Sequence, residues 1–471
     1  MRCPLPELSV QSNITQPQTN ATPLAPKGSS AWKVAVIGNF SGLHPSGEQA
    51  SLLKRKHHRI TKDNFEEVFE RLNVQLKLAI FDNTIRFEDI DDLNPDYIYQ
   101  NVAAFSQYRD LIEKLQSKAH FQSAVAQLQA HGLIEQTQIA AKARDLLPEN
   151  LLDSVLSSAK QHSDAGFSVE ALIRQTIAPH IETQLDPRAE EYIAAVEAAA
   201  SDLLRSIMHA SEFKQLEASW RCIDLINRKL DTDRACHLHI LDANLQAIKH
   251  DADTHINNIE ASELYRNLIA DKAVAGNKPY DAILLDINME EADAELLQFF
   301  TRFAQAANIR LLTGAAINTS GYSSVEALLD DQAAQPQSDA WQQARNTAGA
   351  QNLFACTPPF MIRLPYGAKT SPIDSLRFEE LPNNNAKKSF YLWANSAYLV
   401  LMTLVNGNNS IDGLPFHVTF DNDGDELLVP TTGAYLPAKA VEKLENTGLT
   451  VVQSVKNSDA VLVQRWVSFS G

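Results

Sequence analysis

WKVAVIGNFSG, residues 32–42, has the pattern of a buried β-strand that ends in a turn. Its two glycines are spaced as GxxxG, whereas nucleotide-binding loops carry GxGxxG, or GxxxxGK followed by Ser or Thr. The next residues, LHPSG, are a poor start for the helix whose N-terminus would hold a phosphate. We therefore predict a structural turn instead of a nucleotide site. The turn residues are Gly38, Asn39, Phe40, Ser41 and Gly42.

The first block of the chain, residues 32–116, predicts a small unit of strand, helix, strand and helix. Asp63 and Glu66 have the spacing of a capping box, and apolar residues follow them at helical intervals. VQLKLAI (74–80) alternates like a half-buried strand. The dipeptide Asn94-Pro95 opens a second helix, because proline is favoured at the first helical position.

A second α/β block follows a stretch rich in Ala, Gln and Leu. It begins with a helix over 211–230, whose apolar residues fall on one face and whose opposite face is polar. Runs of apolar residues with little alternation, separated by helices, indicate a partly parallel, buried sheet. The fold class is therefore expected to be α/β with mixed α+β character. The expected strands are 237–241, 281–287, 309–314 and 359–367, and the other expected helices are 292–307, 389–405 and 437–446.

Composition limits the possible functions. At 471 residues the chain is long enough for two or three domains, and 44% hydrophobic with 21% charged residues is ordinary for a globular protein. The net charge of -17 argues against non-specific nucleic-acid binding, so we expect no nucleic-acid partner. No apolar run approaches the roughly 20 residues of a membrane span, and the N-terminus lacks a signal-peptide core. We expect a cytoplasmic protein whose cysteines are free thiols.

No group of residues predicts catalysis or metal binding. The acidic run 421–426 lacks the ligand spacing of an EF-hand and fits a hairpin tip better. Asp286 ends an apolar strand, where α/β enzymes often place a carboxylate, but it has no partner motif. His237 and His239 share a strand face without a third ligand. We expect no catalytic residue, cofactor or metal, and keep a ligand-binding protein that uses the strand ends near Asp286 as an alternative.

Residues of the first block resemble the small sheath subunit of bacterial type VI secretion, TssB or VipA-type. GNFSG (38–42) is similar to a family motif in which Asp stands in place of Asn39. ITKDNFEEVFERL (60–72), with Asn64 and Phe65, resembles the helix that follows this motif. LNPDYIYQNVAAFSQYRDLIEKLQ (93–116) matches a later helix of the same family.

The second block resembles the large sheath subunit, TssC or VipB-type. IMHASEFKQLEASWRCIDLI (207–226) is similar to a family helix, with Ala210 and Cys222 as departures. NKPYDAILLD (277–286), PPFMIRLPYG (358–367), RFEE (377–380) and LWANSAY (392–398) follow in the family order. The residues that match the family motifs are Leu216, Glu217, Trp220, Arg221, Arg363, Pro365, Tyr366, Trp393 and Asn395.

The resemblance implies a sheath-type body of mixed sheets with packed helices, built from both subunits in one chain. The expected parts are a flexible arm (1–31), a small-subunit-like domain (32–130), a helical connector with large-subunit N-terminal helices (131–200), and a large-subunit-like domain (201–471). Large subunits of the family continue beyond VQRWVSFSG (463–471) with strands that interlock neighbouring subunits, and we expect this chain to lack them. Within the arm, LSVQSNI (8–14) is the segment that could add to a neighbour as a strand.

The same resemblance implies a non-enzymatic structural or accessory component of a type VI contractile sheath. Its expected partners are TssB- and TssC-type sheath subunits, with baseplate or cap proteins as further candidates. An adaptor or chaperone for sheath subunits, or for the ClpV-type ATPase that recycles the sheath, is the alternative. LLPENLLDSVLSSA (146–159) lies where that ATPase recognises a helix in the family.

Overall fold

The computed structural model describes residues 31–42, 51–79, 84–128, 188–270, 280–330, 334–381, 388–420 and 426–471. The arm strand 8–14, most of the connector with its 146–159 segment, and residues 421–425 of the expected hairpin tip lie outside the described residues. Among the described helices, none combines the length and the hydropathy that a membrane span needs.

The opening stretch forms β1, the strand on which the central sheet is built. The sheet has seven strands in the order β14-β8-β7-β6-β1-β5-β2, all parallel except the edge strand β2. A strand from the first block therefore lies between two strands of the second block. The strands are β1 (Trp32–Gly38), β2 (His57–Ile60), β5 (Cys236–Asp242), β6 (Ala282–Met289), β7 (Arg310–Ala315), β8 (Leu353–Thr357) and β14 (Leu449–Val451).

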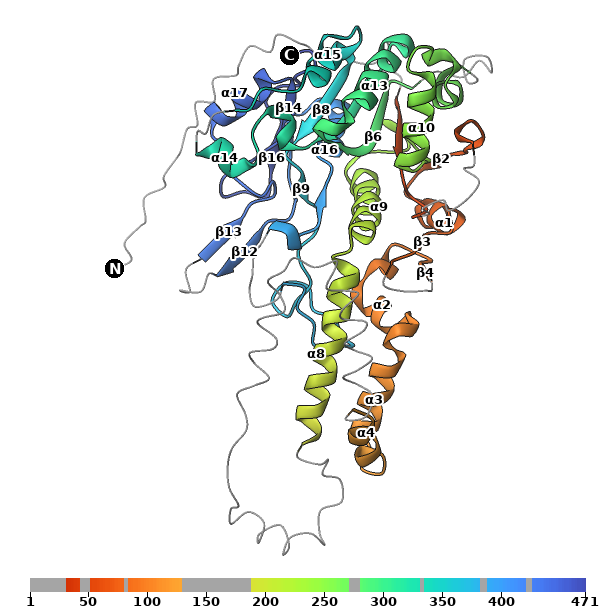
Figure 1. The fold of residues 1–471 in the computed structure, drawn as a ribbon, viewed down its shortest axis with the longest axis vertical. Helices are drawn as coiled ribbons and strands as arrows, with labels where there is room; N and C mark the ends of the chain where they lie inside the picture. The colour runs from red at the N-terminus through yellow and green to blue at the C-terminus, as the bar shows by residue number, and fades with distance from the viewer. Residues whose placement is uncertain are drawn as a thin grey trace, which may run out of the picture.

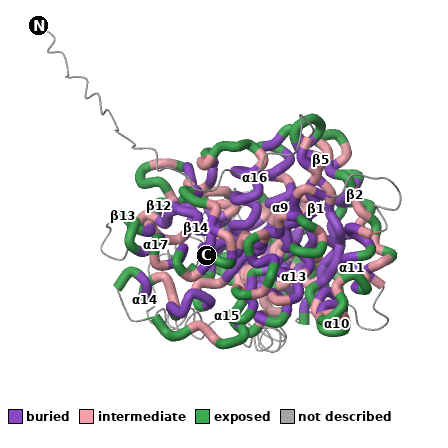
Figure 2. The backbone as a smooth tube through the Cα atoms, turned by 90° about the horizontal axis from the view of Figure 1, so that it is seen from above, coloured by how far each residue is buried: buried purple, intermediate pink, exposed green. Residues whose placement is uncertain are grey.

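The interior strands show little alternation because both faces of the sheet are covered. On β1, Val34 and Val36 join one buried apolar cluster, whereas Ala35 and Ile37 join the other. Figure 2 shows the tube buried along β1 and the neighbouring α9. The edge strand β2 carries His57, His58 and Arg59, a polar composition that suits a sheet edge.

Helices cover the sheet on its two faces, which gives three layers (Figure 1). One face packs against α1 (Phe65–Arg71), α9 (Ser211–Lys229) and α16 (Ala397–Asn406). The other packs against α10 (Leu245–His255), α11 (Glu263–Tyr265), α13 (Ala294–Ala307), α15 (Asp339–Asn346) and α17 (Ala438–Asn446), with the short α14 (Val325–Leu329) nearby. The α/β class is confirmed.

A helical stalk extends away from the sheet (Figure 1). It consists of α2 (Pro95–Asn101), α3 (Ser106–Gln116), α4 (Phe121–Gln127) and α8 (Ala189–Met208). α3 packs along α8, so the stalk also joins the two blocks. α8 is rich in alanine and has two glutamates in its first turn, which suits helix propensity and the helix dipole.

Smaller antiparallel pairs complete the fold. β12 and β13 form the expected hairpin on the flank of the molecule opposite β2 (Figure 1). The strands are β3 (Gln75–Leu76) with β4 (Ile85–Arg86), β9 (Phe360–Met361) with β10 (Trp393–Ala394), β12 (His417–Phe420) with β13 (Glu426–Val429), and β11 (Ser410–Ile411) and β15 (Gln453–Ser454) on either side of β16 (Val461–Leu462).

Three predicted elements are wrong in extent, and the face predicted as polar on a fourth is not fully exposed. The strand expected over 359–367 ends at Met361, because the chain then turns to bury the guanidinium of Arg363. The helix expected over 389–405 starts only at Ala397, since Trp393 and Ala394 pair with β9 instead. The strand expected over 74–80 is limited to β3. The polar face expected on α9 is partly buried, as Glu217, Ser219 and Asn227 show.

The predicted capping box at the first helix is also wrong. Asn64, one residue after Asp63, is the residue that precedes α1. Its side-chain oxygen accepts a hydrogen bond from the backbone N–H of Thr61 (2.8 Å), and its amide donates to the carbonyl of Arg59 (3.0 Å). Asn64 therefore fixes the turn between β2 and α1. Asn94, by contrast, caps α2 as expected, with Pro95 at its first position.

Candidate functional site

Motif residues from both blocks meet in an aromatic cluster, which consists of Phe40, Phe65, Phe69 and Trp220. The indole of Trp220 is fully buried on α9, and its Nε1 donates to the carbonyl of Phe40 (2.8 Å). Its ring lies edge-on to Phe40 and Phe65, and 4.5 Å from Phe69 between ring centroids. Aromatic pairs of this kind stabilise a fold by more than the burial of their apolar surface alone. The cluster thus holds the first block on the second.

The GNFSG turn is built for close packing. Gly42 has φ +71°, and a Cβ there would lie 2.0 Å from the carbonyl oxygen of Gln75, so only glycine fits. The N–H of Ser41 donates to the carboxylate of Asp242 (2.9 Å) at the end of β5. The carbonyl of Ser41 accepts from the N–H of Gln75 (3.0 Å), and Leu216 of α9 packs against Gly42. The turn joins β1, β3, β5 and α9, and its residue Asn39 is half-buried.

A second cluster, the charge network, consists of Glu217, Arg221, Arg363 and Glu380. Glu217 and Arg221 belong to α9, as do Leu216 and Trp220. Arg363 bridges two buried carboxylates, each through two nitrogens: Glu217 at 2.7 and 3.0 Å, and Glu380 at 2.7 and 3.0 Å. Such paired contacts are the strongest hydrogen bonds an arginine makes. Arg221 adds a third guanidinium contact, from its Nε to Glu217 (2.7 Å).

Tyr366 completes the charge network from the segment after Pro365. Its hydroxyl accepts from Arg221 (3.1 Å), its ring lies 4.5 Å from the guanidinium carbon of Arg363, and its N–H donates to Glu380 (2.8 Å). Burial alone would raise the pKa of Glu217, but the guanidiniums of Arg363 and Arg221 outweigh it and lower that pKa. Two arginines and two glutamates therefore compensate one another inside the protein.

Two motif residues do not join either cluster. The side-chain amide of Asn395 donates to the carbonyls of Leu285 and Ile287 (3.2 Å each), which ties the end of β10 to β6. Trp393 donates from its indole to the carbonyl of Lys388 (2.6 Å). Both contacts stabilise the sheet and its flank.

One residue of the site, Glu380, was not predicted from the sequence as a functional residue. It appears there only within the RFEE motif. The acidic pair of RFEE, together with the arginine that begins the RLPYG stretch, is the signal that could have pointed to Glu380.

Asp286 is hydrogen-bonded within the fold. Its Oδ2 accepts a hydrogen bond from the Ser219 hydroxyl (2.5 Å) on α9, and burial raises its pKa. The contact ties β6 to the helix above it. His237 and His239 lie on β5, whereas Asp286 lies on β6. Within the described ranges, no three or more His, Cys, Asp or Glu side chains gather where they could hold a metal ion.

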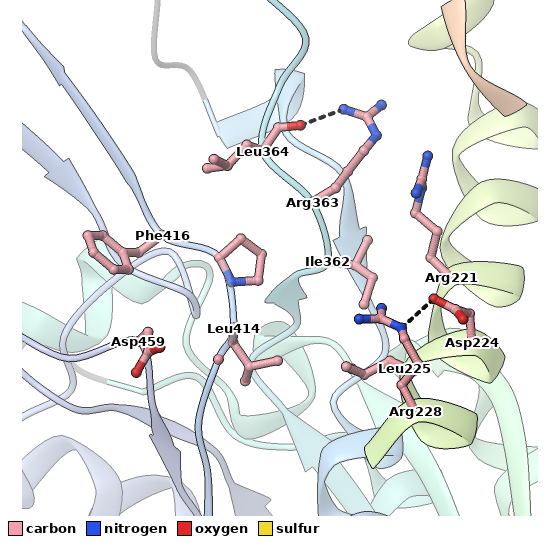
Figure 3. Close-up of a pocket in the computed structure, with 12 residues that line it drawn as sticks. Arg221, Asp224, Leu225, Arg228, Ile362, Arg363, Leu364, Leu414, Phe416 and Asp459 are labelled. Carbon is pink, nitrogen blue, oxygen red and sulfur yellow. Dashed lines mark hydrogen bonds and ion pairs between the residues drawn. The ribbon is translucent and has the colours of Figure 1, made fainter. Parts of the chain in front are cut away.

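A groove of about 610 Å³ opens between α9 and residues 413–416 (Figure 3). Its α9 wall carries Asp224 and Arg228, which pair at 2.8 Å, and its opposite wall carries Phe416 and Asp459. Phe416 is 39% exposed, and Val418 and Leu427 are exposed on the adjoining hairpin. Exposed apolar side chains gathered beside a groove are typical of protein contact surfaces. The groove is further lined by Arg221, Leu225, Ile362, Arg363, Leu364, Gly413, Leu414 and Pro415.

Two known protein families match the chain, one over each of its two blocks. Residues 190–468, more than half of the chain, match the family described as EvpB/VC_A0108, tail sheath N-terminal domain (VipB). Residues 29–141 match the family described as Type VI secretion system, VipA, VC_A0107 or Hcp2. The chain therefore belongs to the type VI secretion sheath family, with a TssB-like part followed by a TssC-like part.

A curated sheath protein of the TssC type is also similar to this chain. The chain is 26% identical over 296 residues to the type VI secretion system sheath protein TssC1 of Pseudomonas aeruginosa. The match covers 57% of this chain and 59% of that relative, so the chain spans about three fifths of its length.

Proposed function

We propose that this protein is a non-enzymatic structural component of a type VI contractile sheath, in which one chain supplies the small-subunit-like and large-subunit-like parts together. The position of β1 between β5 and β6 carries the proposal, because the small-subunit-like part completes the sheet of the large-subunit-like part. A body joined in this way is suited to act as one rigid building block.

The polar motif residues support a structural role. Glu217, Arg221 and Arg363 satisfy one another inside the protein, and Asp286 accepts its hydrogen bond from Ser219. Catalysis requires polar groups aimed at a substrate position. The polar groups of these motifs are aimed at other parts of the fold.

We further infer that the groove and the exposed face beside it contact other sheath subunits of the TssB and TssC type. Phe416 offers an aromatic anchor on one wall of the groove and Arg228 lies on the other, and aromatic and arginine side chains dominate binding energy at many interfaces. The alternative role as an adaptor for sheath subunits, or for a ClpV-type ATPase, depends on residues 146–159. Baseplate or cap proteins as partners, and a cytoplasmic location, are proposals from the family alone.

The test is co-expression of the tagged chain with separate TssB- and TssC-type subunits, followed by pull-down and electron microscopy. We expect the chain to be recovered with the subunits and to be found in, or at the ends of, sheath tubes. Recovery with free subunits but absence from tubes would favour the adaptor role, and no recovery would contradict a sheath role. Phe416→Glu should weaken the association at least about tenfold. Leu329→Glu is the matched control, because Leu329 is 41% exposed on α14, away from the groove.

A further inference from the structure

The joint between the stalk and the body is only two residues long. α8 ends at Met208 and α9 begins at Ser211, with His209 and Ala210 between them. The side chain of His209 is 6% exposed. Its ring stacks on Phe390, with centroids 5.1 Å apart and planes 26° apart. The ring of His209 therefore lies buried at the point where the stalk meets the body.

Neither ring nitrogen of His209 has a hydrogen-bond partner among the described residues. The closest acidic oxygen, Oε1 of Glu380, lies 3.8 Å from Nε2, which is too long for a hydrogen bond. Glu380 is already held by both terminal nitrogens of Arg363. A buried, unpaired imidazole is costly, so the site holds a group that gains from becoming exposed.

Charged groups face His209 from every element packed around it. Arg205 approaches from α8, Lys214 from α9, and Arg363 and Glu380 from the segment over 363–380, while Glu217 of α9 acts on Lys214. The carboxylates are engaged by Arg363, so the cations prevail at the imidazole. Burial, with the help of Lys214, Arg363 and Arg205, lowers the pKa of His209 to about 3. The closed joint therefore admits only neutral histidine.

We propose that the joint between α8 and α9 is a proton-sensitive hinge, in which neutral His209 holds the helical stalk on the body and its protonation releases it. An imidazole that leaves the joint for water regains an ordinary pKa of about 6.5. Proton uptake then stabilises the open form, and more so as the pH falls below that value. The open fraction should rise roughly 30-fold between pH 8 and pH 5.

Neighbouring groups contribute little to this pH dependence. Burial lowers the pKa of Lys214 to about 8, so its charge changes only at and above the upper end of the range. Glu217, whose pKa is lowered by the two arginines, stays ionised at pH 5. The inference is independent of the proposed sheath role, because it concerns only contacts within the chain.

The test is hydrogen–deuterium exchange of the full chain between pH 5 and pH 8, corrected for the intrinsic exchange rate, with peptides that span 203–214. We expect opening of this segment to rise about 30-fold at pH 5. His209→Phe keeps a ring on Phe390 but cannot titrate, so its exchange should be independent of pH. His120→Phe is the matched control, since His120 is exposed before α4, and should respond to pH like the unmodified protein.

Phe390→Leu supplies a second variant that keeps the imidazole. It removes the stacking partner of His209, so it should raise exchange at every pH while leaving the pH dependence in place. Flat exchange of the unmodified protein between pH 5 and pH 8 overturns the proposal without reference to any variant. An unchanged pH response in His209→Phe overturns it as well, because another group would then be the sensor.

Discussion

Replacement of Trp220 by alanine should lower the free energy of unfolding by about 4 kcal/mol, within the 3–5 kcal/mol usual for large-to-small truncation of a buried tryptophan. The indole is fully buried, and truncation removes its contacts with Phe40, Phe65 and Phe69. It also removes the donor to the carbonyl of Phe40. An unpaired buried carbonyl adds about 1–3 kcal/mol where water cannot reach it, so the upper half of the range is expected.

Urea unfolding followed by circular dichroism measures this loss. Trp220→Phe is the matched variant, since it keeps an aromatic ring but no N–H, and it should lose less than the alanine variant. A double-mutant cycle with Phe69→Ala should give a coupling of about 0.5–1.5 kcal/mol, as expected for an aromatic pair in contact. A loss below about 1 kcal/mol for Trp220→Ala would refute the reasoning, because the cluster would then not hold the two blocks together.

Three further changes test the same region of the fold. Arg363→Met should cost about 3–5 kcal/mol in urea unfolding, because it leaves the carboxylates of the charge network buried without their main partner; a neutral result would contradict that pairing. Gly42→Ala should cost at least about 3 kcal/mol through strain and its clash with Gln75, whereas Gly407→Ala, also at positive φ but in open space, should cost about 1 kcal/mol; equal losses would contradict the close approach. Burial lowers the pKa of Lys214 to about 8, so the folded state disfavours its charge and stability should rise from pH 8 to pH 10.5; Lys214→Met should abolish this rise in melting temperature, and an unchanged rise would assign it to another group.

Local sequence pattern predicts the long elements well. The 3.6-residue spacing from Phe213 to Leu230 predicts α9 almost to the residue, and Asn94 and Pro95 mark the start of α2. Each of these signals lies within one element, where helical periodicity and capping act directly. The confirmed family resemblance rests on the same stretches.

The pairing of segments that are far apart in the chain could not be predicted from the sequence. The apolar run around Trp393 fits a helix locally, but hydrogen bonds to Met361 and Phe360 make it a strand. The position of β1 between β5 and β6 depends on partners far along the chain. The contacts of His209 with Phe390 and Glu380 are likewise tertiary, so no local sequence pattern predicts them.

The central position of β1 also determines when the sheet can form during synthesis. The strand emerges before both of its neighbours in the sheet, which are made about 200 and about 250 residues later, at typical ribosomal speeds on the order of 10–50 s. During that interval WKVAVIG is an unpaired apolar segment, the kind of segment that aggregates or recruits chaperones. Because β1 and its partner strands share one chain, their meeting is a loop closure instead of a collision between two molecules. Its rate is therefore independent of how much of the protein the cell contains.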